Sequence, residues 1–267
     1  MTKWVGAAVL AMSLLLATGA AAQAPARKPA SPEEAAALKS LSALFKDSTT
    51  PPARFNSAIA DFRLQFPASA YMLPVLVLGE RYSRAHSDYP AMLDYGLAAL
   101  GLEPHDLYSL STLGAAIPDN VKDSDLDREQ RLQQAAGFDQ QVITVVEGWM
   151  ITPSGLQYGG IHYTESQAKT LRDNLGGPAY LALGRIRALQ QQYPDAVTAY
   201  QQALKFQTAP LQQAQTYYDM AVAEGDGGQA PAAQAALAKA KTLGAGSPFL
   251  QRMIEIEEAK LAAPGPG

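Results

Sequence analysis

The sequence predicts an all-α protein in which pairs of helices form hairpins that stack along one axis. Three observations lead to this prediction. A Leu-Gly pair recurs with alanines at fixed distances behind it, apolar residues elsewhere follow helical spacing, and prolines mark the ends of the segments. A single hairpin cannot bury its own apolar face, so copies of it must stack. The hydrophobic content of 48% supplies enough apolar surface for such a core.

The first 22 residues have the three parts of a secretory signal peptide. Lys3 supplies a positive charge, an apolar run follows over 5–16, and three alanines over 20–22 form a cleavage site. A membrane-spanning helix needs roughly 20 apolar residues, and this run is shorter. We therefore expect cleavage after Ala22 and a periplasmic or secreted mature protein, with no stable membrane insertion.

Composition excludes several classes of site. The chain has no cysteine among its 267 residues, which rules out disulfides, thiolate zinc sites and cysteine nucleophiles. Its net charge of −4 is a poor match to nucleic acid, whose phosphates require a basic surface. No phosphate loop, dinucleotide fingerprint or nucleophile elbow is present. We expect no cofactor, no metal, no catalytic residue and no nucleic-acid partner.

One set of spacings occurs three times along the chain. Leu78-Gly79 is followed at intervals of 12, 4 and 3 residues by Ala91, Tyr95 and Ala98. The same intervals recur in two further sets, which are Leu183-Gly184, Ala196, Tyr200 and Ala203, and Met220-Ala221, Ala233, Leu237 and Ala240. Small residues let two helices of a hairpin approach closely, and the aromatic residue or Leu fills the groove between hairpins.

With Tyr82 three residues after Gly79, this pattern resembles the tetratricopeptide repeat (TPR) family. The resemblance implies a right-handed superhelical solenoid of helix-turn-helix repeats with a C-terminal capping helix. The expected domain organisation is a signal peptide over 1–22, a flexible linker over 23–30, a repeat domain over 31–263 and a disordered tail over 264–267. Within the domain, the repeats are clearest over 72–105, 177–210 and 214–248.

The other segments are also predicted to be helical. Ser31 to Glu34 form a capping box that opens a first helix ending near Lys46, and a second helix buries aromatic residues at helical spacing before Pro67. These two helices form a degenerate first repeat. The aromatic and aliphatic residues concerned are Phe55, Ile59, Phe62 and Phe66.

The middle and the end of the domain are less regular. Gly114 starts a further repeat whose second helix, capped by Ser124 and Asp127, is longer than usual. A second capping box at Thr164 opens a helix that leads into 174–178. Ser247-Pro248 begin the capping helix, in which Phe249, Met253, Ile256 and Leu261 form the apolar stripe.

Two features resemble ligand sites. Acidic residues alternate over 123–129 as at the start of a calcium loop, but Arg128 replaces the turn glycine and Gln134 the bidentate Glu, so we interpret them as helix-capping acids. None of the three histidines, which are His86, His105 and His162, has a second ligand at metal-type spacing. An irregular insertion over 148–164 is rich in aromatic residues and glycine.

The resemblance also implies a binding surface. In this family the partner lies in the concave groove lined by the first helix of each hairpin. Transferred by register, the groove positions hold the candidate partner-binding residues Glu80, Tyr108, Arg185, Gln215 and Tyr218. The Lys and Asn residues that clamp a terminal carboxylate in some family members are missing from these positions.

The function that we expect is a non-catalytic protein-protein interaction scaffold of the bacterial cell envelope. It would bind a peptide or a helix of a partner protein in the concave groove. Two alternatives stay open at this point. The insertion over 148–164 could serve a small-ligand-binding protein or an enzyme, or the chain could assemble with copies of itself.

Overall fold

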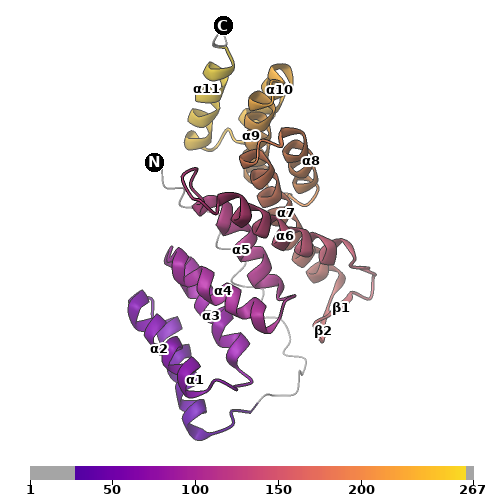
Figure 1. Cartoon of the computed structure of the whole chain (residues 1–267). Coiled ribbons are helices and arrows are strands. Elements are labelled where there is room, and N and C mark those ends of the chain that lie inside the picture. The colour runs from indigo at the N-terminus through magenta and orange to yellow at the C-terminus, as the bar shows by residue number, and fades with distance from the viewer. Residues whose placement is uncertain (1–27, 263–267) are drawn as a thin grey trace.

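Figure 1 shows a computed structural model of the protein, which describes residues 28–262. Within these residues the chain forms eleven helices and one two-stranded hairpin, so the all-α fold class is confirmed. None of these helices combines the length and apolarity needed to cross a bilayer. The predicted signal peptide over 1–22, most of the linker and the tail over 264–267 lie outside the described residues.

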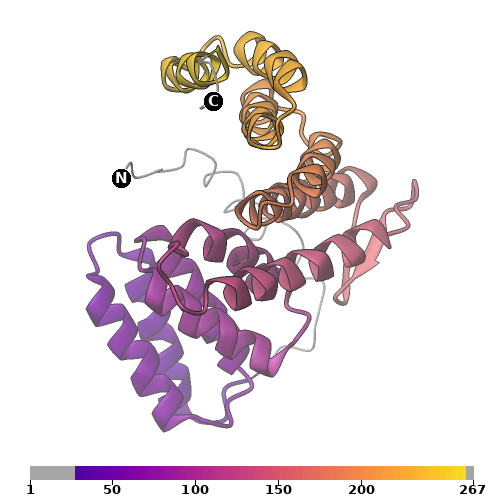
Figure 2. The same cartoon turned by 45° about the horizontal axis from the view of Figure 1, so that its top comes forward.

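Ten of the helices are arranged as five successive hairpins, and the last one follows them. Their bounds are α1 (Pro32–Lys46), α2 (Pro52–Gln65), α3 (Met72–Ala85), α4 (Tyr89–Leu102), α5 (Leu107–Asn120), α6 (Arg128–Glu147), α7 (Glu165–Leu189), α8 (Tyr193–Leu204), α9 (Pro210–Asp226), α10 (Ala230–Leu243) and α11 (Pro248–Ala262). Figures 1 and 2 show the hairpins stacked in sequence order from α1 to the capping helix α11.

The stack is curved, and the first helix of each hairpin lies on its inner side. Helix α3 contacts α5, α5 contacts α7 and α7 contacts α9, whereas the second helices contact one another at most marginally. Helices on the inside of a curve come closest together. We call the surface formed along α3, α5, α7 and α9 the inner face.

The repeated spacing has a direct packing cause. A Cβ added at Gly79 would lie 2.8 Å from Cδ2 of Tyr95, and one added at Gly184 would lie 2.5 Å from Cε1 of Tyr200. Both tyrosines are buried. The absence of a side chain at the glycine therefore lets the ring of the second helix lie directly on the backbone of the first.

The two helices predicted for the first repeat are present. Ser31 caps α1 by accepting a hydrogen bond from the Glu34 backbone N–H at 3.1 Å. The Glu34 carboxylate accepts from the Ala30 N–H rather than from Ser31, so only half of the predicted capping box forms. On α2 the side chains of Phe55, Ile59 and Phe62 are buried, as their spacing predicts, whereas Phe66, the C-cap residue, is only half-buried.

The predicted cap of α6 is wrong. The helix begins at Arg128, and its N-cap residue Asp127 makes no side-chain capping hydrogen bond. The neighbouring acids instead form ion pairs, from Asp123 to Arg128 and from Asp125 to Arg131, each at 3.3 Å. These two carboxylates are therefore paired with arginines of the first turn instead of capping the helix terminus. The described residues contain no group of three potential metal ligands.

Helix α7 is longer than the sequence predicts. It runs without interruption from Glu165 to Leu189, through Gly176, Gly177 and Pro178, where the repeat over 177–210 is predicted to begin. The capping box at its start is confirmed, with the Thr164 hydroxyl accepting from the Gln167 N–H. A Cβ added at Gly176 would lie 2.8 Å from the Phe206 ring. These glycines therefore serve close helix packing rather than a turn.

The insertion over 148–164 contains an ordered β-hairpin. Strands β1 (Leu156–Tyr158) and β2 (Ile161–Tyr163) pair antiparallel, with Gln157 opposite His162. The turn between them consists of Gly159 and Gly160, whose φ angles of 57° and 75° suit the two-residue turn that matches strand twist. Glycine adopts positive φ without steric cost, which explains the Gly-Gly pair.

Candidate functional site

The N-terminal part of the inner face carries two arginines beside an aromatic ring. The guanidinium carbon of Arg81 lies 5.8 Å from the ring centroid of Tyr108, a cation–π distance. Arg84 reaches from α3 to the hydroxyl of Thr112 on α5. In the part of the chain that the structure describes, neither guanidinium has a carboxylate within 4 Å. This segment of the inner face is therefore positively charged.

The middle of the inner face carries a charge cluster across three helices. Arg185 on α7 binds Asp219 on α9 through Nε and Nη2 at 3.1 and 3.0 Å, and its Nη1 lies 3.9 Å from Asp119 on α5. Burial raises the pKa of Asp219, and Arg185 opposes that rise. Two acids share one base, so the cluster is negative when all three groups are ionised.

The structure separates the five predicted groove residues into two kinds. Tyr108 and Arg185 lie on the inner face with part of their side chains accessible, and Gln215 is half-buried. Glu80 has no exposed surface and Tyr218 has 9%, so both are core residues with little or no surface for a partner. The position of each residue in the repeat predicted its helix correctly. It did not predict how much of each side chain the next hairpin would bury.

Glu80 lies in the core between α3, α4 and α5. Its Oε2 accepts a hydrogen bond from the Ser109 hydroxyl at 2.7 Å, whereas Oε1 has no partner among the described residues. Burial raises the pKa of Glu80 to about 8, the hydrogen bond from Ser109 opposing that shift. The carboxyl is thus mostly protonated at neutral pH in the folded protein.

We expect Glu80→Gln to remove a pH dependence of stability. The folded carboxyl holds its proton up to about pH 8, while the unfolded one releases it above its ordinary value of 4.5. The free energy of unfolding of the wild type therefore falls across this interval, by up to about 1.4 kcal/mol per pH unit. Urea unfolding of the wild type and of Glu80→Gln at several pH values measures how the free energy of unfolding of each protein changes with pH. The same pH dependence of the free energy of unfolding in wild type and variant would contradict a raised pKa of the buried Glu80 carboxyl.

The aromatic residues of the insertion are used in packing. Trp149 and Tyr158 lie 5.0 Å apart between ring centroids, and both pack against a core cluster from α5, α6 and α7. His162 on β2 is exposed, as is His105, while His86 stacks on the Tyr82 ring at 4.1 Å. In the described residues, no histidine belongs to a group of three or more potential metal ligands.

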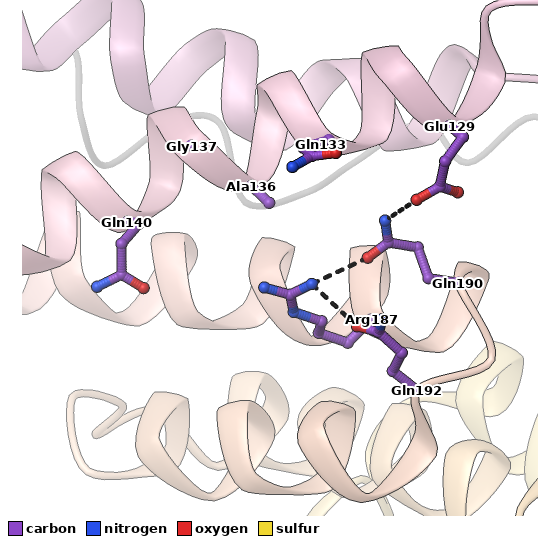
Figure 3. Close-up of a pocket in the computed structure, with 8 residues that line it drawn as sticks. All are labelled: Glu129, Gln133, Ala136, Gly137, Gln140, Arg187, Gln190 and Gln192. Atoms are coloured by element: carbon purple, nitrogen blue, oxygen red, sulfur yellow. Dashed lines mark hydrogen bonds between the residues drawn. The ribbon is translucent and has the colours of Figure 1, made fainter.

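A polar pocket that the sequence analysis missed lies between α6 and the turn from α7 to α8 (Figure 3). Its volume is about 350 Å³, and half of its lining residues are glutamines. The lining residues are Glu129, Gln133, Ala136, Gly137, Gln140, Arg187, Gln190 and Gln192. One sequence pattern could have indicated this pocket. The spacing of positions 133, 136, 137 and 140 places two glutamines and two small residues on one face of α6.

No family model matches this sequence, and no curated protein matches it. Among solved structures, PilW, described as a widely conserved type IV pilus biogenesis factor, is 13% identical and aligns over 87% of this chain and 93% of its own, with a TM-score of 0.50. A thermophilic TPR protein of Thermus thermophilus is 16% identical over 85% of this chain and 99% of its own, with a TM-score of 0.48. The likeness to PilW concerns the fold, and the chain is a TPR-like helical repeat solenoid.

Proposed function

We propose that the protein is a non-catalytic interaction scaffold that holds a peptide or a helix of a partner protein on its inner face. The observation that carries this proposal is the group formed by Arg81, Arg84 and Tyr108. Arginine and tyrosine are enriched among the residues that dominate binding energy in protein interfaces. Two guanidinium groups without a carboxylate partner favour an acidic side chain on the bound segment.

The proposed place of action is the bacterial cell envelope. The signal peptide predicted over 1–22 directs the chain to export, and the lack of cysteine suits a protein that folds by packing alone. The fold neighbour PilW is by its description a type IV pilus biogenesis factor, and this description is compatible with the proposal. The partner protein would then be an envelope protein.

Photo-crosslinking in cells tests the inner face directly. A benzoylphenylalanine at position 108 is expected to give a discrete adduct with an envelope protein. The same group at position 64 serves as the control, because Leu64 is 81% exposed on α2 and away from the inner face. Adducts that are identical at both positions, or none at position 108, would exclude the inner face as the binding surface.

The double variant Arg81→Ala, Arg84→Ala is expected to lower the yield of this adduct by about tenfold or more, because each loss of a hot-spot arginine costs over 1 kcal/mol of binding. Both side chains are part-exposed, so the thermal unfolding midpoint should stay unchanged. Arg185 is a poorer probe, since its removal leaves Asp219 without its partner. An unchanged adduct yield in the double variant would contradict the role of the arginines.

A further inference from the structure

Arg187 lies at the centre of the polar pocket and is held in one orientation. Its Nη1 donates to the side-chain oxygens of Gln190 and Gln192, at 3.1 and 2.9 Å. Figure 3 shows the remainder of the guanidinium directed along α6, away from these two bonds. Among the described residues, neither Nε nor Nη2 has a hydrogen-bond acceptor, and no carboxylate lies within 4 Å. A guanidinium that is bound through Nη1 and has two further donor atoms free is suited to a carboxylate.

The one acid of the pocket does not neutralise Arg187. The carboxylate of Glu129 accepts instead from the side-chain amide of Gln190, at the opposite end of the hydrogen-bonded chain (Figure 3). The charge of Arg187 therefore stays available inside a concave polar site. A volume of about 350 Å³ is within the usual range for ligand sites.

The wall on α6 complements an extended peptide. Gln133 and Gln140 make no side-chain hydrogen bond in the described structure, and a Cβ added at Gly137 between them would meet no atom within 4 Å. Seven residues of helix separate the two glutamines by about 10.5 Å along the axis. Three residues of extended chain cover about the same length. A carboxamide donates and accepts as a peptide group does, so both glutamines can bind the main chain of one short segment.

The pocket is separate from the inner face. Arg185 and Arg187 are two residues apart on α7, and successive helical residues are rotated by about 100°, so the two side chains leave the helix on opposite sides. Arg185 contacts α5 and α9, whereas Arg187 lies against α6 and the start of α8. A ligand in the pocket would leave the inner face accessible.

We propose that this pocket binds an extended peptide segment with an acidic side chain, which pairs with Arg187 while the segment's main chain lies along Gln133 and Gln140. The site does not depend on the function proposed for the inner face. It is a second peptide site on the same solenoid.

Titration by nuclear magnetic resonance tests the proposal with two probes, the blocked pentapeptides acetyl-Ala-Ala-Glu-Ala-Ala-amide and acetyl-Ala-Ala-Gln-Ala-Ala-amide. The Glu peptide is expected to shift the Arg187 Nε–H signal and the side-chain amide signals of Gln133 and Gln140 in a saturable manner. The Gln peptide should bind about tenfold more weakly, because it lacks the charge-assisted bond. No shift with the Glu peptide up to about 10 mM, or equal binding of both peptides, would overturn the proposal.

Gly137→Met provides a variant that fills the pocket without harming the fold. The new side chain enters open space, and methionine is a better helix former than glycine, so the variant should unfold at the same urea concentration or a higher one. Binding of the Glu peptide should be lost. The matched control is Gly101→Met on α4, where an added Cβ also meets nothing within 4 Å and binding should be unchanged. Binding that persists in Gly137→Met would place the peptide elsewhere and refute the site.

Discussion

Replacing Tyr200 with alanine is expected to lower the free energy of unfolding by about 3–5 kcal/mol, the usual cost of deleting a large buried ring. Tyr200 is 2% exposed and lies between α7 and α8 in the C-terminal core cluster. Its ring packs directly on the backbone of Gly184, which has no side chain that could fill the space that alanine would leave. Urea unfolding followed by circular dichroism measures the loss.

The next repeat supplies a matched control for this experiment. It has Ala221 and Leu237 where this repeat has Gly184 and Tyr200, and both of those residues are fully buried in the same cluster. The double variant Gly184→Ala, Tyr200→Leu copies that pair and should be clearly more stable than Tyr200→Ala. Gly184→Ala alone should destabilise the protein, because its Cβ would lie 2.5 Å from the Tyr200 ring. A double variant no more stable than Tyr200→Ala would show that the two positions do not pack as a pair.

The repeat spacing predicted these pairs because the two helices of a hairpin are adjacent in the sequence. Gly79 and Tyr95 lie on the two helices of one hairpin, 16 positions apart, so a short stretch of sequence predicts their contact, although Ile59 of the preceding hairpin also packs against Gly79. The caps at Ser31 and Thr164 are local in the same sense and were also predicted. Helix α7 was not predicted as one element, because Gly-Gly-Pro is a strong breaker in isolation. In the folded chain, Gly176 packs closely against Phe206, a contact between distant residues that the local sequence does not reveal.

The candidate site was predicted less completely because burial at the inner face depends on contacts between hairpins. Register correctly assigned Glu80 to α3, but the covering residue, Ser109, belongs to the next hairpin. The capping helix gives a second example. Its predicted stripe begins at Phe249, which is 52% exposed, whereas the buried stripe begins one residue later with Leu250 and Ile254. Both stripes have helical spacing, and the turn before α11 decides which one faces α10.

The third hairpin breaks the packing rule of the others at Asp139. A Cβ added at Gly114 would lie 2.2 Å from Oδ1 of Asp139, so the carboxyl occupies the place that Tyr95 and Tyr200 occupy in their repeats. Asp139 has no exposed surface, and neither of its carboxyl oxygens has a hydrogen-bond partner among the described residues. Burial raises the pKa of Asp139 well above its ordinary value of 3.8. The folded state therefore takes up a proton that the unfolded chain releases.

Asp139→Asn is expected to raise the free energy of unfolding near neutral pH, by about 1.4 kcal/mol for each pH unit between 3.8 and the raised folded pKa, because the amide has no proton to release. The sign follows from linkage. A carboxyl with a raised folded pKa weakens the fold as the pH rises above 3.8, and this loss continues up to the folded pKa. The gain from Asn should accordingly be close to zero at about pH 4 and grow towards pH 7.5.

Urea unfolding at both pH values measures this gain in the free energy of unfolding. Asp61→Asn on the exposed side of α2 is a control that should change little at either pH. A gain that is the same at both pH values, or a loss at pH 7.5, would mean that the Asp139 carboxylate is paired in solution and that the third hairpin does not pack its carboxyl directly on Gly114.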